Sequence, residues 1–373
     1  MNILILTLYA STKTEFSEGI GGAQEVIHQL GKRWVKMGHN VRIISAYRDK
    51  NIPKKEIVDG IEIERVCSFY TAIYGIKKVY KKYEEWADIV LENYTSYPIY
   101  TPLYVRKSLF VIMHHLMGKE YIKASGLQGL IGYLSEKLIP YIYNRTKFIA
   151  VSDFAKKQLL SIGIPEKNIN VIYNGIDLDE YMPAEKSKDP LIFFVGNFID
   201  GRKRVEDLIE AFKIVNKKIP DAKLVIAGYG GKRENLIKKL IKNNNNIEFL
   251  GRIDENKKKK LYQKAWIFVN PSIMEGFSLT ALEAHACGTP VIAYKIDGLE
   301  TVIDGVNGLV VKKINIKALA NTIIKIVEDD KLRNELSRNA RETSEMYSWD
   351  IAAKRYLDVF WRGYNEYKQK CYV

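Results

Sequence analysis

Residues 270–288 read N-P-S-I-M-E-G-F-S-L-T-A-L-E-A-H-A-C-G and place two carboxylates, Glu275 and Glu283, on either side of a turn that leads into a helix. The glycine after Glu275 permits a tight turn of the backbone. The run that follows is rich in Ala, Leu and Glu, which are good helix formers. We therefore expect a helix that begins near Ser278 and carries Glu283 in its first turns.

The start of this helix predicts a phosphate-binding site. The backbone N–H groups of Ser278, Leu279 and Thr280 are expected to face outward there, and a helix N-terminus carries about half a positive charge. A carboxylate at Glu283 is unsuited to phosphate, but it can accept hydrogen bonds from sugar hydroxyls. Together these features predict a site for a phosphate joined to a polyol, such as a nucleotide.

The size and composition of the chain indicate two domains in a reducing compartment. The 373 residues, 47% of them hydrophobic, suffice for two buried cores. Three widely separated cysteines, Cys67, Cys287 and Cys371, argue against a disulfide framework. The first residues lack the basic region and long apolar run of a signal peptide, and no run approaches the roughly 20 apolar residues of a membrane span. A cytoplasmic protein is expected.

The formal net charge of +14 allows more than one interpretation. A lysine-rich solvated surface explains it as well as attraction to nucleotide donors, lipid phosphates or an anionic membrane surface. Nucleic-acid binding is another class that charge alone would allow. The sequence has no zinc-ligand spacing, RNA-binding sheet motif or basic zipper region, so no nucleic-acid partner is expected.

Short apolar runs alternate with helical patterns, which predicts an α/β protein with a parallel sheet in each half. The expected strands are residues 3–6, 41–45, 89–91, 109–113, 148–151 and 169–172 in the first half, and 191–195, 223–227, 247–250, 267–269, 290–293 and 308–311 in the second. Residues 181–190 are polar with two prolines and form the expected linker. Residues 349–364 carry apolar side chains every three to four positions, which predicts one stripe of an amphipathic helix.

Three further motifs follow expected strands, where ligands bind in open parallel sheets. Gly21-Gly22-Ala23 precedes a helix and is either a simple turn or a close backbone approach to a ligand. Residues 196–204, G-N-F-I-D-G-R-K-R, carry three cations in a row that suit a leaving diphosphate or form an exposed basic turn. His114 and His115 are either structural or functional.

Several of these motifs resemble family 4 of the retaining glycosyltransferases. The resemblance rests on the E-x7-E spacing of Glu275 and Glu283, followed by A-C-G-T-P-V-I-A at residues 286–293. Further matches lie in order along the chain at residues 21–23, 151–152, 174–177, 196–198, 203–204 and 304–309. The resemblance implies a GT-B fold, with two Rossmann-like domains facing across a cleft. Residues 1–180 are expected to bind the acceptor, and residues 191–345 the nucleotide sugar. Residues 346–373 are expected to form a helix that packs on the N-terminal domain.

The resemblance also implies roles for individual residues. Residues expected at the transferred sugar and the leaving phosphate are Glu275, Lys203, Arg202 and His114, with His115 left open as the alternative to His114. Residues expected at the donor nucleotide are Glu283, which holds the ribose, and Gly22, Gly196, Asn197, Ile253, Gly276, Phe277, Ser278, Leu279 and Thr280. The family usually has arginine where Asn197 stands, and Arg202 is the expected replacement.

The expected activity is transfer of a hexose, with retention and without a metal, from a UDP- or GDP-sugar to an acceptor hydroxyl on a lipid-linked molecule, a glycan or a small polyol. No Asp-x-Asp motif stands at a strand end, and no cofactor is expected. Peripheral contact with the inner face of the membrane stays open, because residues 69–143 are rich in tyrosine and lysine. Two other classes also stay open: another enzyme of this fold, such as a nucleotide-sugar epimerase or sugar phosphorylase, and a non-catalytic subunit that binds nucleotide sugars.

Overall fold

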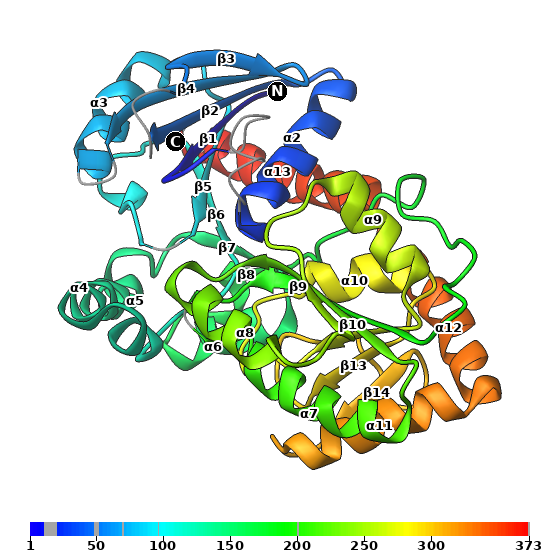
Figure 1. Ribbon diagram of the computed structural model, residues 1–373. Coiled ribbons are helices and arrows are strands. Elements are labelled where there is room, and N and C mark those ends of the chain that lie inside the picture. Colours follow the sequence, from blue (N-terminus) through cyan, green and yellow to red (C-terminus); the bar gives the residue numbers. More distant parts are fainter. Residues whose placement is uncertain (11–20, 48–51, 69–70, 96, 200, 372–373) are drawn as a thin grey trace. The chain divides into compact units, whose positions relative to one another are not determined.

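The computed structural model describes the chain except residues 11–20, 48–51, 69–70, 96, 200 and 372–373, and the side chains at 123–126, 128, 370 and 371 (Figure 1). The chain forms two compact units. The first contains Met1–Asn174 and Trp349–Val373, and the second contains Gly175–Ser348. Each unit is an α/β structure built on one sheet.

The sheet of the first unit has the strand order β3-β4-β2-β1-β5-β6-β7-β8, and only the pairing of β3 with β4 is antiparallel among its described strands. Its strands are β1 (Asn2–Thr7), β2 (Asn40–Tyr47), β3 (Lys55–Val58), β4 (Ile61–Ser68), β5 (Ile89–Tyr94), β6 (Ser108–Met113), β7 (Lys147–Ala150) and β8 (Ile169–Val171). The helices are α2 (Gly22–Lys36), α3 (Ala72–Tyr83), α4 (Glu120–Lys137), α5 (Ile139–Ile142), α6 (Asp153–Ser161) and α13 (Trp349–Cys371), with short 3₁₀ turns at Thr101–Leu103 and Glu166–Asn168.

The sheet of the second unit is parallel, in the order β11-β10-β9-β12-β13-β14. Its strands are β9 (Leu191–Asn197), β10 (Lys223–Tyr229), β11 (Ile247–Phe249), β12 (Ile267–Asn270), β13 (Val291–Tyr294) and β14 (Gly308–Val311). The helices are α7 (Val205–Lys218), α8 (Glu234–Ile241), α9 (Glu255–Lys264), α10 (Leu279–Ala286), α11 (Ile316–Glu328) and α12 (Asp330–Glu345), with a 3₁₀ turn at Gly231–Arg233.

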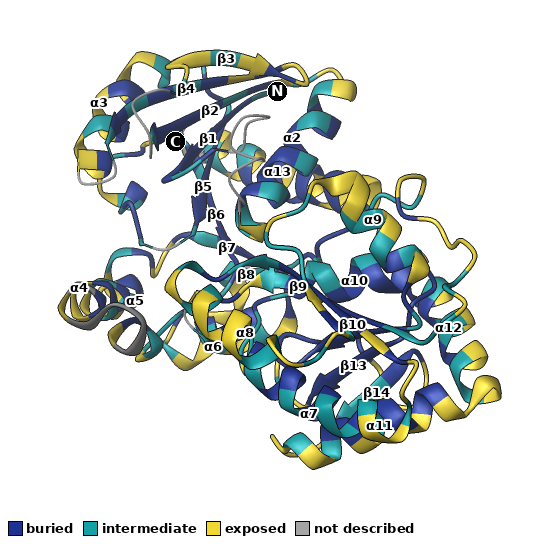
Figure 2. Ribbon diagram, in the orientation of Figure 1, coloured by how far each residue is buried: buried dark blue, intermediate teal, exposed yellow. Residues whose placement is uncertain are grey.

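Both sheets have buried central strands, which Figure 2 shows as dark arrows. In the second unit one core cluster contains Phe212 of α7 and Ile323 of α11, and another contains Tyr262 of α9 and Leu282 of α10. Because helices cover both faces, the central strands are mostly apolar runs, whereas β4, next to the edge strand of the first sheet, alternates apolar and charged residues. This is why each expected strand is present in the structure.

The antiparallel hairpin of β3 and β4 was missed by the sequence prediction. Asp59 and Gly60 join these strands with φ of 51° and 80°. An Asp-Gly pair with two positive φ angles is the usual signal for a two-residue hairpin turn. The alternation of apolar and charged residues in β4 was the second available signal.

The expected linker at residues 181–190 is wrong, because the boundary between the units falls after Asn174. The stretch belongs to the second unit, where the Tyr181 side chain is buried and its ring lies 6.4 Å from that of Tyr262. Polarity and prolines do not distinguish such a packed loop from a free linker.

The C-terminal helix α13 packs on α2 in the first unit. The Trp34 indole donates to the carbonyl oxygen of Ala353 at 3.1 Å, and its ring lies 5.4 Å from that of Phe360. The predicted apolar stripe forms this contact, with Trp349 and Tyr356 also buried. Among the described residues, no helix is both long and apolar enough to cross a membrane.

Candidate active site

The carboxyl ends of β9 and β12 bring Lys203 and Glu275 together in the second unit. The Lys203 Nζ atom lies 2.5 Å from Glu275 Oε1, and their side chains are only 20% and 11% exposed. The Asn270 amide, at the end of β12, donates to Glu275 Oε1 at 3.2 Å and to Ser278 Oγ at 2.9 Å. Residues 72 positions apart in sequence thus form one cluster at the edge of the sheet where parallel α/β folds bind ligands.

Electrostatics keep this cluster charged. Burial acts to raise the pKa of Glu275, but the Lys203 ammonium and hydrogen bonds, including that from Asn270, outweigh it and leave this pKa below its ordinary value. Glu275 is therefore a carboxylate at neutral pH. Lys203 is held in a fixed place, which suits a cation that must stabilise charge as it develops.

The basic loop after β9 is joined to the Glu275 loop by its backbone. Ile273 N–H donates to the carbonyl oxygen of Arg202 at 3.0 Å, and Arg202 Nη1 lies 3.7 Å from Met274 Sδ. Arg204 instead forms an ion pair with Asp207 at 2.8 Å. Asp200, which belongs to the same predicted motif, lies outside the described residues.

Asn197 and Gly196 have different roles in this loop. Asn197 is exposed, and its Oδ1 atom accepts from Ile199 N–H at 3.2 Å, so it stabilises its own turn. Gly196 lies against Gly228 of the neighbouring strand, where an added Cβ at Gly228 would be 1.9 Å from the Gly196 carbonyl oxygen. The glycine at 228 is therefore required for the two strand ends to approach.

Helix α10 begins at Leu279, as expected. Ser278 is its N-cap, and the Ser278 hydroxyl accepts from Ala281 N–H at 3.3 Å and lies 3.2 Å from Thr280 Oγ1. Gly276 is buried just before it. Phe277 is partly buried, with its ring 6.0 Å from that of Tyr347. The predicted phosphate-binding residues thus form one continuous turn.

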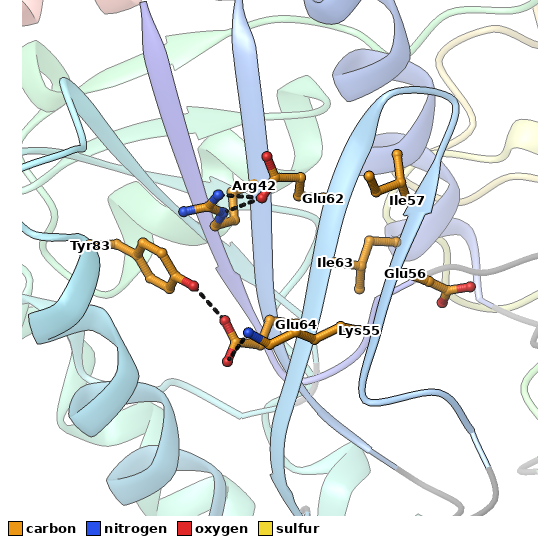
Figure 3. A pocket seen from close by; sticks show the side chains of 8 residues that line it. All are labelled: Arg42, Lys55, Glu56, Ile57, Glu62, Ile63, Glu64 and Tyr83. Atoms are coloured by element: carbon orange, nitrogen blue, oxygen red, sulfur yellow. Dashed lines mark hydrogen bonds and ion pairs between the residues drawn. The ribbon is translucent and has the colours of Figure 1, made fainter.

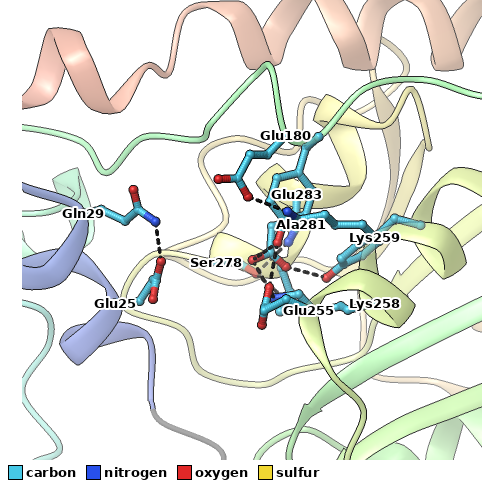
Figure 4. A network of polar contacts seen from close by, with 12 residues as sticks. Glu25, Gln29, Glu180, Glu255, Lys258, Lys259, Ser278, Ala281 and Glu283 are labelled. Carbon is cyan, nitrogen blue, oxygen red and sulfur yellow. Dashed lines mark hydrogen bonds and ion pairs between the residues drawn. The ribbon is translucent and has the colours of Figure 1, made fainter. Parts of the chain in front are cut away.

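Glu283, in the second turn of α10, is held by a network of polar contacts (Figure 4). Lys258 Nζ lies 3.0 Å from Glu283 Oε1, and Tyr262 donates its hydroxyl to Oε2 at 2.9 Å. Tyr181 donates to Oε1 at 3.4 Å and to Glu255 at 3.0 Å. Lys258 also pairs with Glu255 at 2.9 Å, so a single lysine bridges two carboxylates.

The pKa of Glu283 reflects this burial. Burial raises the pKa above its ordinary value, although the Lys258 ammonium opposes the change.

Sequence reasoning missed Lys258, because residues 257–260 are four consecutive lysines and nothing in the pattern selects one of them. The helical period of α9, with the buried Tyr262 one turn later, was the only available signal.

Ile253, one of the residues expected at the donor nucleotide, packs against the core beside α9 and α10. The neighbouring Arg252 guanidinium lies 4.0 Å from the centroid of the Tyr229 ring. Tyr229 ends β10, and Arg252 and Ile253 follow β11, so all three lie at the same sheet edge as Lys203.

The predicted site residues of the first unit lie at the carboxyl ends of its strands. Gly22 is the first residue of α2, and His114 follows β6 and is 7% exposed. The His114 Nε2 atom lies 2.8 Å from Oδ1 of Asn93, a residue of β5 that the sequence prediction missed. Burial, and to a smaller extent the charge of His115, lowers the pKa of His114 to about 3.

A hollow elsewhere in the first unit contains none of the predicted site residues (Figure 3). It is lined by Arg42, Lys55, Glu56, Ile57, Glu62, Ile63, Glu64 and Tyr83. Arg42 pairs with Glu62, Tyr83 donates to Glu64 at 2.6 Å, and Lys55 lies 3.6 Å from Glu64. Because these charges already pair with one another, we assign no ligand to this hollow.

Comparison with known proteins identifies the family. The profile described as Glycosyltransferase Family 4 matches residues 20–180, and the profile described as Glycosyl transferases group 1 matches residues 179–343. An uncharacterised glycosyltransferase of Methanocaldococcus jannaschii is 37% identical over 216 residues, which cover 56% of this chain and 57% of that protein. A phosphatidyl-myo-inositol mannosyltransferase of Mycobacterium leprae is 25% identical over 91% of this chain and 92% of its own length.

Among solved structures, Anabaena HepE in complex with UDP and glucose superposes with a TM-score of 0.76 at 20% identity, over 96% of this chain and 99% of that one. The chain therefore belongs to glycosyltransferase family 4, the glycosyl transferases group 1, and has the GT-B fold. Its activity is the transfer of a sugar from a nucleotide-sugar donor.

The Glu275 loop depends on Gly298. This residue has φ of 82°, and an added Cβ would lie 2.0 Å from the Glu275 carbonyl oxygen. Gly298→Ala should displace Glu275 and lower kcat/KM about a hundredfold, because misplacement by about 1 Å is enough for such a loss. Gly305→Ala is the matched control, since Gly305 has φ of 75° with nothing within 4 Å of the added Cβ. Equal rates for the two variants would contradict this dependence.

Lys258 should control the ionisation of Glu283. In Lys258→Met the carboxylate loses its cation, its pKa rises further, and nucleotide affinity should fall about tenfold at neutral pH. Affinity should then increase as the pH is raised, because the ionised form is the stronger acceptor for hydroxyls. Calorimetric titration between pH 6 and 9 measures this. Lys260→Met, on an exposed position of the same helix, is the control; matching profiles for both variants would disprove the role of Lys258.

Proposed function

We propose that the chain is a retaining, metal-independent hexosyltransferase, in which the second unit binds a UDP- or GDP-sugar and the first unit binds the acceptor. The observation that carries this proposal is the Lys203–Glu275 ion pair beside the start of α10. It combines a fixed cation, a helix N-terminus and an ionised carboxylate at one sheet edge, which suits a sugar joined to a diphosphate.

The leaving diphosphate is stabilised by Lys203, by Arg202 in the same loop and by the N-terminus of α10. Glu275 is already bound by Lys203 and Asn270, so it acts on the sugar by hydrogen bonding and not as a covalent nucleophile. The acceptor oxygen then attacks from the face that the diphosphate leaves, and the leaving phosphate takes the acceptor proton. The configuration at the anomeric carbon is retained.

The ribose is bound by Glu283. A carboxylate has about four acceptor positions, and Tyr262 and Lys258 take two of them at 2.9 and 3.0 Å. The contact from Tyr181 is longer, at 3.4 Å, and is the one that a ribose hydroxyl replaces. A UDP- or GDP-hexose as the proposed donor is consistent with two similar proteins: Anabaena HepE binds UDP and glucose, and the mycobacterial protein is a mannosyltransferase.

Binding to nucleotides gives the first test. The nucleotide among UDP, GDP and ADP that matches the site should raise the melting temperature; at 100 times its Kd the stabilisation is about 2.7 kcal/mol. The shift and the activity should survive EDTA, and ¹H NMR of the product should show the anomeric configuration of the donor. Inversion, or loss of activity with EDTA, would overturn the mechanism.

Two substitutions separate turnover from binding. Lys203→Ala should reduce kcat by about 10²- to 10³-fold, as expected for removal of one fixed group that stabilises developing charge. Glu283→Ala should instead weaken nucleotide affinity. Lys238→Ala, at an exposed position of α8, is the control. An epimerase would change the donor without acceptor, a phosphorylase would need free phosphate, and a binding subunit would give no turnover in any variant.

We further propose that the acceptor is lipid-linked. One face of α4 and α5 is an exposed apolar stripe, which suits contact with a membrane that holds such an acceptor. Its side chains are spaced three or four residues apart, as one helical face requires. They are Leu127, Leu130, Ile131, Leu134, Leu138 and Tyr141, with Leu127 and Tyr141 exposed by 79% and 77%. The opposite face is anchored by Glu136, whose carboxylate accepts from Met117 N–H at 2.9 Å and Gly118 N–H at 2.7 Å.

Charge near this stripe favours an anionic membrane surface. Lys119, Lys137 and Arg145 are exposed beside or beyond the helix ends, whereas Glu136 is buried. Each such cation adds about 1 kcal/mol of attraction to an anionic leaflet. The stripe and these cations support the proposal that the protein binds the inner face of the cytoplasmic membrane as a peripheral protein.

Vesicle sedimentation tests this surface. The triple variant Leu127→Ser, Ile131→Ser, Leu134→Ser should lose at least tenfold in binding to vesicles containing phosphatidylglycerol, because burying each such aliphatic side chain contributes about 1.5–3 kcal/mol. Ile57→Ser, which removes another exposed apolar side chain, is the control. Unchanged vesicle binding would exclude the membrane, and a dimer that only the triple variant disrupts would identify a second copy as the occupant.

A further inference from the structure

A single buried amide connects the two predicted site elements of the first unit. Asn93 lies near the end of β5 and is 2% exposed, and His114 directly follows β6, the neighbouring strand. Asn93 Nδ2 lies 3.4 Å from the carbonyl oxygen of Ala23, in the first turn of α2, and 3.2 Å from Thr7 Oγ1. Its Oδ1 atom lies 2.8 Å from His114 Nε2.

The partners of Asn93 fix the orientation of its amide. The Ala23 carbonyl oxygen can only accept a hydrogen bond, so the amide nitrogen must face it. The Thr7 hydroxyl donates to the Tyr9 carbonyl oxygen at 3.1 Å, so it too accepts from Asn93. A flipped amide would set oxygen against both acceptors inside the protein, at a cost of about 1–3 kcal/mol for each unmade bond. The Oδ1 atom therefore faces His114.

This orientation determines where the proton of His114 resides. An amide oxygen has no hydrogen, so the contact at 2.8 Å requires a proton on Nε2. The ring is neutral at ordinary pH, because burial lowers its pKa to about 3. A neutral ring with its proton on Nε2 has a lone pair on Nδ1, and that atom can only accept.

We propose that Asn93 is a positioning residue that fixes the Nε2–H tautomer of His114, so that His114 Nδ1 accepts a hydrogen bond from a substrate hydroxyl. The same amide holds the first turn of α2, where Gly22 lies, in register with His114. His114 then orients the substrate and takes no part as a general acid. The substrate contact rests on the proposed transferase function, whereas the tautomer does not.

The tautomer can be observed directly. The chain has five histidines, so two-bond ¹H–¹⁵N spectra of protein labelled only at histidine are simple enough to assign with His114→Gln. Wild-type protein should show the Nε2–H form of His114 from pH 6 to 8. Asn93→Leu keeps the side-chain volume but removes the acceptor, and it should convert His114 to the Nδ1–H form or to a mixture.

The effect of the His114 tautomer on catalysis is measured by kcat/KM. Asn93→Leu should lower kcat/KM about ten- to a hundredfold, the range expected when a buried hydrogen-bonded group loses its partner. Thr7→Val is the matched control, because it removes another partner of Asn93 and leaves the contact with His114 intact. It should keep the Nε2–H form and stay within about twofold of wild-type kcat/KM. Melting temperatures establish that both variants are folded.

The outcomes separate the two proposals. An Nε2–H signal that persists in Asn93→Leu, or an equal loss of activity in Thr7→Val, would overturn the role of Asn93. A changed tautomer with kcat/KM within twofold of wild type would also overturn it. If wild-type protein transfers sugar from none of the tested nucleotide sugars, the proposed function fails, while the spectra still decide the tautomer.

Discussion

The ion pair between Lys203 and Glu275 is the interaction on which the proposed donor site depends. Two charges with little exposure to water are stable there only because each neutralises the other, and removing one partner of such a pair typically costs about 3–5 kcal/mol. The pair also holds two loops together, since Ile273 N–H binds the Arg202 carbonyl oxygen beside it. The pair is also linked to α10, because the Asn270 amide donates both to Glu275 and to Ser278, the N-cap of that helix. A site assembled in this way suits the diphosphate that we propose it binds.

Local pattern was enough to predict the strands and the start of α10. The central strands are mostly apolar runs because helices cover both sheet faces, and Ser278 is a favourable N-cap residue before a run of helix formers. The contacts that complete the site were beyond local pattern. Lys258 is one of four adjacent lysines, and Asn93 gives no signal until β5 and β6 lie side by side. These partners are far apart in sequence and meet only when the chain folds, so local sequence pattern does not predict them.

The contrast between local pattern and tertiary contacts also explains the wrong linker prediction, but not the missed hairpin. The stretch at residues 181–190 resembles a linker in composition, yet Tyr181 is buried against the Tyr262 ring in the core of the second unit. The missed hairpin is different, because Asp59-Gly60 is a strong local signal for a two-residue turn. Family membership identifies the reaction class, whereas the buried contacts of Asn93, Lys258 and Tyr181 come from the folded structure.

The chain leaves the first unit at Asn174 and returns to it at Trp349, so the second unit is an insertion within the first. This has a consequence for synthesis on the ribosome. The second unit is one continuous segment and can complete its fold as soon as it emerges, but the first must wait for α13. Until then the surface around Trp34, which α13 covers from 319 residues away, is exposed to solvent. The half of the protein made first is therefore finished last, and during that interval its apolar surface is open to chaperones or to aggregation.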